Sequence, residues 1–240
     1  NSRKAKEANS LYCLDEASGE VLWGANVGYG SYHFLLKGND LFVAARRPTD
    51  TWTQASLRYI DHAKVNILNG NVDWYLGARG NGDTSTGLML KNNVISQITD
   101  AGGLKYFIGR NTNNGEIKHD KNYHGEWPYF GVILIGDHYY SGDRFGNLLE
   151  FDPRTGGVGE VFNIGKEFDE YRDKDTVWIV PRGLTDNIIF SLSTWFSSRN
   201  DGGKGRKIIK INLDTEETET ICELDATKSI EPSSFGLLFD

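Results

Sequence analysis

A strand–turn–strand pattern recurs along this 240-residue chain and constrains its fold more than any other feature. The first copy is "LYCLDEASGEVLW", in which two short apolar runs flank the turn residues Asp15 to Gly19 and the second run ends at Trp23. An Asp or Asn side chain can bond the backbone two residues on, and Gly reaches positive φ without steric cost. The motif is therefore Asp or Asn, two residues, Ser or Thr, Gly, three residues and Trp.

Four weaker copies of this motif follow. "VNILNGNVDW" keeps Gly70 and Trp74, "RNTNNGEIKH" has His119 at the Trp position, and "FDPRTGGVGE" has Glu160 there. "INLDTEETET" replaces the glycine by Glu216. The copies are about 40 to 60 residues apart, a period typical of β-propellers, and their anchoring residues are Asp15, Asn66, Asn111, Asp152 and Asn212.

A second hairpin lies between successive copies. "HFLLKGNDLFVAAR", "GLMLKNNVISQI", "YFGVILIGDHYYSG" and "IVPRGLTDNIIFSLS" each join two apolar runs by a short polar turn, which is a hairpin signal. One period is then four antiparallel strands, A to D, which make a propeller blade. We predict an all-β fold, a β-propeller of five blades with four antiparallel strands each.

The domain boundaries follow from this count. Residues 1–9 are expected to be a flexible arm and residues 10–240 a single propeller domain. The last blade would be closed by the two ends of the chain, although it lacks a strand B, so either it has three strands or the chain is part of a larger propeller. The predicted blades are residues 33–76, 86–119, 129–163, 178–223, and a composite of 234–240 with 10–23.

Composition excludes several classes of protein. A net charge of −7 argues against nucleic acid as the main partner, because phosphate binding needs a basic face. No run approaches the roughly 18 apolar residues of a membrane span. The chain begins at Asn1 rather than Met, so we expect either a processed protein, whose removed signal peptide would not show, or a recombinant form of a longer protein. A periplasmic or secreted location is favoured. Two small buried thiols are favoured over a disulfide between Cys13 and Cys222.

The first copy resembles the repeat of the quinoprotein-like superfamily of pyrroloquinoline-quinone-type propellers, with Cys13 at its small position and Trp23 at its docking position. The resemblance implies that Trp23 and Trp74 dock neighbouring blades. That superfamily includes alcohol dehydrogenases and the propeller lipoprotein of outer-membrane assembly. Its quinone enzymes are expected to have about eight blades and a quinone, a calcium ion and a catalytic Asp. The five blades predicted here, with no adjacent Cys-Cys pair, argue against quinoprotein catalysis, and we expect no cofactor.

The long connections D–A and B–C should emerge on one face of such a propeller, and loops on a rigid scaffold commonly carry function. Aromatic and Arg residues, the types found at binding hot spots, lie in or beside these connections. Some of the aromatics are alternatively expected to pack over blade ends, Trp178 above all. The candidate binding residues are Tyr29, Tyr32, Arg46, Arg47, Trp52, Arg79, Tyr123, Trp127, Tyr171, Trp195 and Arg199.

Signals for catalysis or metal binding are weaker. His119, Asp120, His124 and Glu126 crowd one stretch, but only the two His are good transition-metal ligands, so a solvated polar loop is favoured and no metal is expected. A glycoside hydrolase needs two carboxylates across a pocket. The predicted A strands contain none, and the candidates in the preceding loops are Asp83, Glu126 and Asp175.

The sequence therefore favours a non-catalytic binding propeller whose long-loop face contacts another protein. An extracytoplasmic inhibitor, an immunity partner of a toxin or an envelope assembly factor would fit, and the acidic balance suits a basic partner. The alternative is a carbohydrate-active five-bladed propeller, either a glycan binder or a glycoside hydrolase, which would stack sugar rings on the same aromatics.

Overall fold

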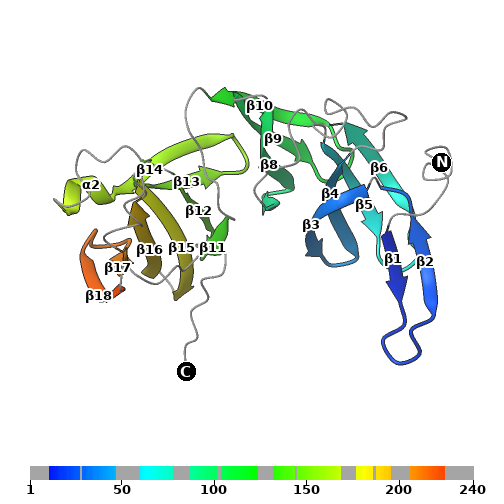
Figure 1. Cartoon of the computed structure of the whole chain (residues 1–240). Coiled ribbons are helices and arrows are strands. Elements are labelled where there is room, and N and C mark those ends of the chain that lie inside the picture. The colour runs from blue at the N-terminus through cyan, green and yellow to red at the C-terminus, as the bar shows by residue number, and fades with distance from the viewer. Residues whose placement is uncertain are drawn as a thin grey trace. The chain divides into compact units, whose positions relative to one another are not determined.

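The computed structural model describes residues 11–27, 29–46, 60–77, 87–101, 104–123, 132–143, 145–168, 177–185, 188–195 and 206–224. The chain divides into two compact units (Figure 1). Unit 1 comprises Asn1–Gly125 with Pro153–Gly156, and unit 2 comprises Glu126–Asp152 with Gly157–Asp240.

Unit 1 contains a two-stranded sheet and two four-stranded sheets, all antiparallel. The hairpin pairs β1 with β2, and the larger sheets have the orders β3-β4-β5-β6 and β10-β9-β8-β7. The strands are β1 (Leu11–Leu14), β2 (Val21–Ala25), β3 (Tyr29–Lys37), β4 (Asp40–Arg46), β5 (Ile60–Asn66), β6 (Val72–Gly77), β7 (Met89–Lys91), β8 (Val94–Ala101), β9 (Leu104–Asn111) and β10 (Ile117–Tyr123).

Unit 2 contains two more sheets, with the orders β11-β12-β13-β14 and β15-β16-β17-β18. Its elements are β11 (Ile133–Ile135), β12 (His138–Gly142), β13 (Asn147–Asp152), β14 (Gly157–Asn163), the single helical turn α2 (Ile164–Glu167), β15 (Val177–Thr185), β16 (Ile188–Trp195), β17 (Arg206–Asn212) and β18 (Thr218–Leu224). The prediction of an all-β fold built from four-stranded antiparallel sheets is confirmed. The strand proposed for residues 234–240 lies outside the described residues.

The repeated turn forms by the chemistry that the motif predicts. The Asp15 carboxylate accepts the backbone N–H of Ala17 at 3.1 Å and of Ser18 at 2.8 Å, and these bonds lower the pKa of Asp15, that from Ser18 most strongly. Asn66 and Asn111 accept the N–H two residues on in the same way, at 2.9 and 2.8 Å. Each of these side chains fixes a turn that joins the last two strands of its repeat.

Apolar side chains fill the space on both sides of the sheets. In unit 1, Val43, Ala63 and Val65 pack against Leu11 and other residues of the β1–β2 hairpin. In unit 2 the largest cluster of buried residues is Ile135, Tyr140, Leu148, Phe162, Ile164, Ile209 and Ile211.

The structure also bears on the two cysteines and on the expectation that no segment spans a membrane. Cys13 and Cys222 are free thiols, but Cys13 is only partly buried and Cys222 is exposed, so the prediction that both are buried is wrong. Cys222 lies on β18, whose side chains from Glu219 to Glu223 are exposed. Among the described residues, no helix is long and apolar enough to cross a membrane.

Candidate functional site

Strand register places the long connections of each sheet at one edge, called here the loop edge. In the β3–β6 sheet, Arg46 pairs with Tyr29 on one side and with Ile60 on the other, and Asp61 pairs with Gly77. All four strands therefore begin or end together there. The short turns, residues 38–39 and 67–71, lie at the opposite end, called here the turn edge.

The connections at the loop edge differ in length. Residues 47–59 join β4 to β5 and residues 196–205 join β16 to β17, whereas only residues 102–103 join β8 to β9. The two long B–C connections are those that the sequence singled out, and the D–A connections of residues 78–88, 124–132 and 164–176 are of similar length. The first D–A connection is shorter than expected, since only residues 26–28 separate β2 from β3.

This last difference changes the position of two predicted binding residues. Tyr29 and Tyr32 belong to β3 rather than to a loop, because the strand extends to the loop edge. Arg46 ends β4 opposite Tyr29, and Tyr123 and Trp195 are the last residues of β10 and β16. The structure therefore brings Tyr29 and Arg46 together in the backbone and puts Tyr123 and Trp195 at the corresponding ends of their own sheets.

The remaining candidates lie outside the described residues. These are Arg47, Trp52, Arg79, Trp127, Tyr171 and Arg199 for binding, and Asp83, Glu126 and Asp175 for catalysis. Trp178 is the second residue of β15, as its place at the start of an apolar strand predicted, but its side chain is outside the described part as well.

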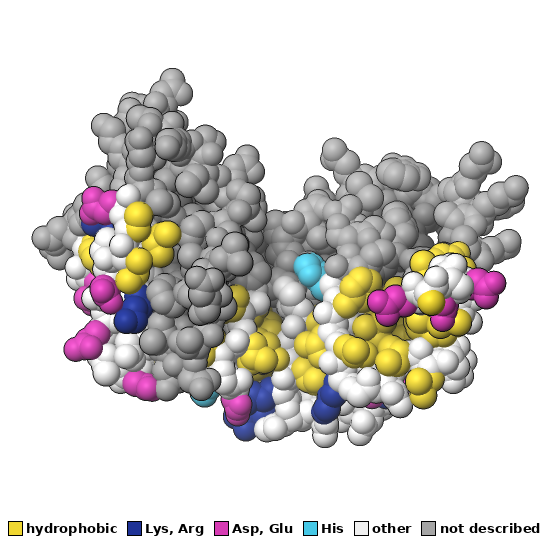
Figure 2. Space-filling model, turned by 90° about the horizontal axis from the view of Figure 1, so that it is seen from below, with side chains coloured by type: hydrophobic (Ala, Val, Ile, Leu, Met, Phe, Trp, Pro, Cys, Tyr) yellow, Lys and Arg dark blue, Asp and Glu magenta, His cyan; other side chains and the backbone are white. Residues whose placement is uncertain are grey.

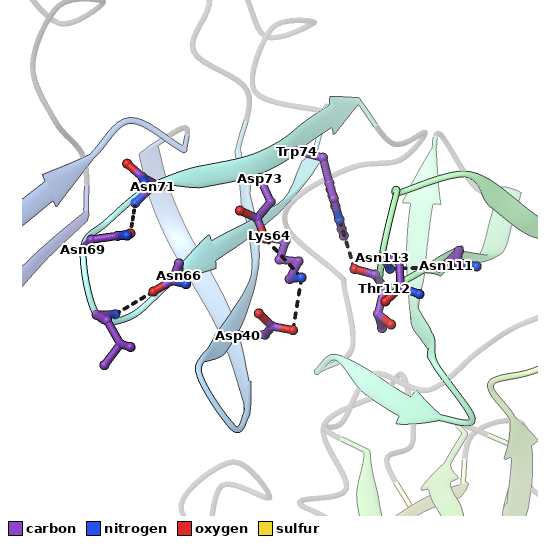
Figure 3. A network of polar contacts seen from close by, with 11 residues as sticks. Asp40, Lys64, Asn66, Asn69, Asn71, Asp73, Trp74, Asn111, Thr112 and Asn113 are labelled. Carbon is purple, nitrogen blue, oxygen red and sulfur yellow. Dashed lines mark hydrogen bonds and ion pairs between the residues drawn. The ribbon is translucent and has the colours of Figure 1, made fainter.

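The turn edge of unit 1 carries a repeated contact between sheets. Trp23 Nε1 donates to the carbonyl oxygen of Ile67 at 2.7 Å. In the same way, Trp74 Nε1 donates to the carbonyl oxygen of Thr112 at 3.1 Å, as Figure 3 shows. Each acceptor directly follows the anchoring Asn of the next repeat. A Cβ on Gly70 would lie 2.8 Å from the Trp23 ring, so the turn glycine provides the space in which the indole sits. We call this arrangement a joint.

His119 occupies the third joint. Its ring is 6% exposed, with Nε2 2.7 Å from the carbonyl oxygen of Pro153 and Nδ1 3.0 Å from that of Phe107. Ser96 Oγ also donates to Pro153 O, at 2.6 Å. His119 and Asp120 belong to β10, which corrects the expectation of a solvated loop at these two positions. Both His119 nitrogens thus face backbone oxygens, and the part of the chain that the structure describes holds no cluster of three potential metal-ligating residues.

Two buried polar contacts, which sequence reasoning missed, add to the association of the β3–β6 and β7–β10 sheets. His62 Nε2 lies 2.8 Å from Gln97 Oε1, and both residues are buried. Arg110, which is 5% exposed, donates from Nη1 to Gly115 O at 2.9 Å and from Nη2 to Gly77 O at 2.5 Å. Gly77 lies at the loop edge, so Arg110 reaches from the interior to the end of β6. An isolated Arg or Gln within an apolar strand is the only sequence signal of these contacts.

A lysine between two carboxylates lies on the β3–β6 sheet. Lys64 Nζ is 3.1 Å from both Asp40 Oδ2 and Asp73 Oδ2 (Figure 3). Burial acts to lower the pKa of the Lys64 ammonium, but hydrogen bonds and charge from Asp73 and Asp40 outweigh burial and raise the pKa. Lys64 therefore stays charged and ties β4, β5 and β6 together.

A buried carboxylate shapes the loop edge of the β11–β14 sheet. Asp143, 3% exposed, accepts the N–H of Phe145 and of Asn147 at 2.8 Å each, and its Oδ2 accepts Asn147 Nδ2 at 2.7 Å. Asn163 donates to Asn147 Oδ1 and caps α2 by accepting the N–H of Lys166. Burial raises the pKa of Asp143, although these hydrogen bonds act to lower it. Its described contacts lie within the B–C turn, so its role is to hold that turn.

Unit 2 also has an open acidic depression of about 500 Å³. It is lined by Glu167, Lys210, Asn212, Glu216, Glu217, Thr218 and Glu219. Lys210 Nζ lies 3.4 Å from Glu219 Oε2, so one carboxylate is partly neutralised. The remaining carboxylates give this part of the surface a negative potential.

The comparisons with known proteins concern the fold. No protein-family model matches the sequence, and no curated protein matches it. Among solved structures, BamB from Moraxella catarrhalis matches at 13% identity and a TM-score of 0.50, over 83% of this chain and 55% of that chain. A europium-containing methanol dehydrogenase matches at 13% identity and a TM-score of 0.51, over 91% of this chain and 44% of that chain.

This chain spans about half the length of these two solved structures. At such low identity the likeness is one of fold. Together with the repeat motif, it shows a β-propeller fold like that of these two structures, the fold that the resemblance of the first repeat implied.

Proposed function

We propose that this protein is a non-catalytic binding propeller that contacts another protein through its loop edge. The observation that carries the proposal is the separation of the two edges. The joints of unit 1 occupy the turn edge, with Trp74 bonded to the turn at Thr112. The long connections 47–59 and 196–205 leave the loop edge of their own sheets.

Residue chemistry at the loop edge supports a protein partner. Tyr29 and Arg46 pair across β3 and β4, and Trp195 ends β16. With Trp52 and Trp127 in the adjoining connections, this is the set of residue types that supplies most binding energy in protein interfaces. The net charge of −7 suits a basic partner and would speed its association at low salt.

The fold is compatible with this proposal but does not favour it over other functions, because one fold can carry many different functional sites. Within the proposal, the setting is extracytoplasmic, and the role is that of an inhibitor, an immunity partner or an assembly factor. The proposed contact residues are those of the sequence-derived set, from Tyr29 to Arg199.

The test is affinity capture from the native source, followed by binding measurements with each captured protein after purification. The variant replaces Trp52, Trp127 and Trp195 by Ala. The matched control replaces three exposed apolar residues away from the loop edge, Leu68, Val72 and Tyr75, which are 70%, 38% and 38% exposed. We expect the Trp variant to weaken binding of the partner at least about 100-fold, as loss of two or more hot spots would, and the control to bind normally.

Retention of every partner by the Trp variant would refute the assignment of the face. Binding to a defined oligosaccharide panel that is lost in the Trp variant, without any protein partner, would replace the proposal by a carbohydrate-binding function. Loss of glycan cleavage on changing Asp83, Glu126 or Asp175 to the amide would identify a hydrolase instead.

A further inference from the structure

Two of the repeated turns in unit 1 contain the dipeptide Asn-Gly. In the second repeat it is Asn69–Gly70, and in the third repeat it is Asn114–Gly115. The first and fourth repeats have Ser18 and Thr155 before the glycine instead. An Asn side chain before glycine is open to attack by the next backbone nitrogen, because glycine has no Cβ to hinder the approach. These two turns therefore contain the groups needed for a spontaneous modification.

The modification of such a dipeptide consumes only water. The backbone nitrogen of Gly70, after loss of its proton, would attack Cγ of Asn69, so that a C–N bond forms and the side-chain nitrogen leaves as ammonia. Water then opens the resulting five-membered imide at either of its carbonyl groups. The product is Asp or isoaspartate, and isoaspartate has one more methylene group in the main chain.

Water reaches the side chains of both turns. Asn69 and Asn114 are exposed, and Leu68, directly before Asn69, is 70% exposed. Figure 2 views unit 1 from the end at which the β1–β2 turn lies and shows hydrophobic side chains at this surface. Both Asn side chains are thus accessible for hydrolysis.

The carbonyl group under attack is polarised in the folded turn. Asn69 Oδ1 accepts the N–H of Asn71 at 2.9 Å, and Asn114 Oδ1 accepts that of Glu116 at 3.2 Å. A donor at a carbonyl oxygen stabilises the negative charge that develops there during nucleophilic attack. The folded turn therefore favours the electrophile, more so at Asn69 with its shorter bond.

The attacking nitrogens, in contrast, are held in backbone hydrogen bonds. Gly70 N–H donates to Asn66 O at 2.8 Å, and the third repeat has the same bond from Gly115 N–H to Asn111 O, also at 2.8 Å. Both glycines are buried. A buried, hydrogen-bonded N–H does not lose its proton to water, so the reaction requires the turn to open first.

A joint covers each of the two glycines. A Cβ on Gly70 would lie 2.8 Å from the Trp23 ring, and a Cβ on Gly115 would lie 3.0 Å from the Trp74 ring. Each indole also donates its hydrogen bond to a carbonyl oxygen of the same turn. The turn can open only when its joint releases, so the Trp of the preceding repeat controls the population of the reactive state.

The two joints differ in strength. Trp74 is buried, whereas Trp23 is only partly buried. Arg110 Nη1 donates to Gly115 O at 2.9 Å and so adds a charged donor to the third-repeat turn. The aligned position of the second repeat is Val65, which has no such donor. The turn at Asn69 should therefore open more often than the turn at Asn114.

We propose that Asn69 is a site of spontaneous conversion to isoaspartate and that the Trp23 joint sets the rate of this conversion. Asn114 is its protected counterpart beneath Trp74. The extra methylene group lengthens the main chain directly before Gly70, so the glycine no longer fits beneath the Trp23 ring. Each opening of this joint thus carries a chance of its irreversible loss.

Timed incubation of the full chain at neutral pH tests the proposal. Proteolytic digestion and mass spectrometry, with synthetic isoaspartyl peptides as standards, quantify the conversion at both positions. We expect Asn69 to convert at least about five times faster than Asn114, as the additional charged hydrogen bond at Gly115 implies. Equal rates at the two positions, or faster conversion of Asn114, would overturn the proposal.

Two matched variants test control by the joints. Trp23→Phe and Trp74→Phe each keep an aromatic ring but remove the N–H donor. Because each leaves a carbonyl oxygen without its partner, we expect Trp23→Phe to accelerate conversion of Asn69 at least about tenfold and to leave Asn114 unchanged. Trp74→Phe should accelerate Asn114 alone. Acceleration of both positions by either variant, or of neither position by both, would contradict control by the individual joints.

Hydrogen exchange gives a readout that needs no change at a Trp. In freshly prepared wild type we expect the Gly70 amide to exchange at least about five times faster than the Gly115 amide. During incubation, exchange of the residue 11–14 amides should accelerate in wild type and stay constant in Asn69→Ser, which has the residue type of the first repeat. Faster exchange at Gly115, or unchanged exchange of residues 11–14 in fully converted protein, would refute the proposed loss of the joint.

Discussion

The repeat positions that form joints between sheets in unit 1 make different contacts in unit 2. In unit 1 each joint combines an aromatic donor, the carbonyl that follows the anchoring residue and a turn glycine, as in Trp23 with Ile67 and Gly70. In unit 2, Glu160 occupies the Trp position of the fourth copy, and Glu216 occupies the glycine position of the fifth copy. Glu160 instead forms an ion pair with Lys166 at 2.6 Å, and Glu216 adopts a φ of 58°.

Unit 2 relies on apolar burial where unit 1 has joints. Tyr140, Phe162 and Ile209 belong to one cluster that draws residues from both of its sheets. Burial, with the charges of Glu150 and Asp214, raises the pKa of Tyr140 to about 12, so its hydroxyl stays protonated in that cluster. The comparison teaches that the motif marks one kind of contact between sheets, and that loss of the motif does not imply loss of packing.

Removal of a joint should give the largest effect. Trp74→Ala deletes an indole that is 9% exposed and leaves Thr112 O without its donor. We expect the free energy of unfolding to fall by about 3–5 kcal/mol, the range for large aromatic truncations in cores. Urea denaturation followed by far-UV circular dichroism measures this loss.

The matched control is Glu160→Ala, at the same position of another repeat. Its carboxylate is 43% exposed and forms a surface ion pair, so the change should cost less than about 0.5 kcal/mol. Equal losses in the two variants would mean that the joint contributes nothing special.

Replacement of the turn glycine by Ala tests whether the joint needs the space that a missing side chain leaves for the indole. Gly70→Ala must accommodate a φ of 75° and a Cβ 2.8 Å from the Trp23 ring, whereas Gly19→Ala has a similar φ of 74° with open space around it. In both variants we expect the positive φ of an Ala residue to lower the free energy of unfolding by about 1–2 kcal/mol. In Gly70→Ala we expect a further loss of about 1–3 kcal/mol, because the added methyl group overpacks the site. Thermal melts of the two variants give the difference, and similar melting points would exclude the clash.

The buried turn of unit 2 predicts a pH-dependent effect. Because burial raises the pKa of Asp143 above its ordinary value of 3.8, the folded state holds this proton more tightly than the unfolded state. Stability contributed by the protonated form is therefore present at low pH and falls as pH rises through the folded pKa. Asp143→Asn should remove this pH dependence and cost about 1–3 kcal/mol through a mismatched donor at Asn147.

Urea unfolding at several pH values from roughly 4 to 7, the range above the ordinary carboxyl pKa, checks the Asp143 prediction. The stability difference between wild type and Asp143→Asn should shrink as pH increases. A difference that is constant with pH would show that Asp143 does not titrate in this window.

The smallest change should restore part of the motif in unit 2. Glu216→Gly relieves a φ of 58° at a non-glycine residue and should stabilise the protein by about 0.5–1 kcal/mol, after the greater flexibility of unfolded glycine is taken into account. Glu217→Gly, one residue on, is the control and should not stabilise. Differential scanning calorimetry measures the change in stability of both variants. Destabilisation by Glu216→Gly would indicate that the Glu216 side chain makes a favourable contact.

The repeat allowed much of the fold to be predicted because its turn chemistry is local. Asp15, Asn66 and Asn111 bond backbone groups two residues away, so their effect can be read from sequence alone. The register of the apolar hairpins likewise follows from alternation. For His119, the sequence predicts the place at the Trp position of the repeat. It does not predict the contacts of the ring with the carbonyl oxygens of Phe107 and Pro153.

Contacts between residues distant in sequence were the part that could not be predicted. Arg110 bonds Gly77, and His62 meets Gln97, across sheets whose relative placement no local pattern encodes. The extent of β3 was missed for another reason. Tyr29 to Tyr32 contain glycine and serine, which read as a loop, but the pairing of Tyr29 with Arg46 extends the strand. The candidate binding residues beyond the strands remain predictions.

The placement of the joints has a consequence for how such a chain can change over generations. Trp74 and Thr112 occupy the turn edge, and the connection 47–59 leaves the opposite edge of the same sheet. Insertions and substitutions in that connection therefore leave the joint's donor, acceptor and glycine untouched. In this sheet the connection can therefore change in length or sequence without altering the contact that docks the sheet to its neighbour.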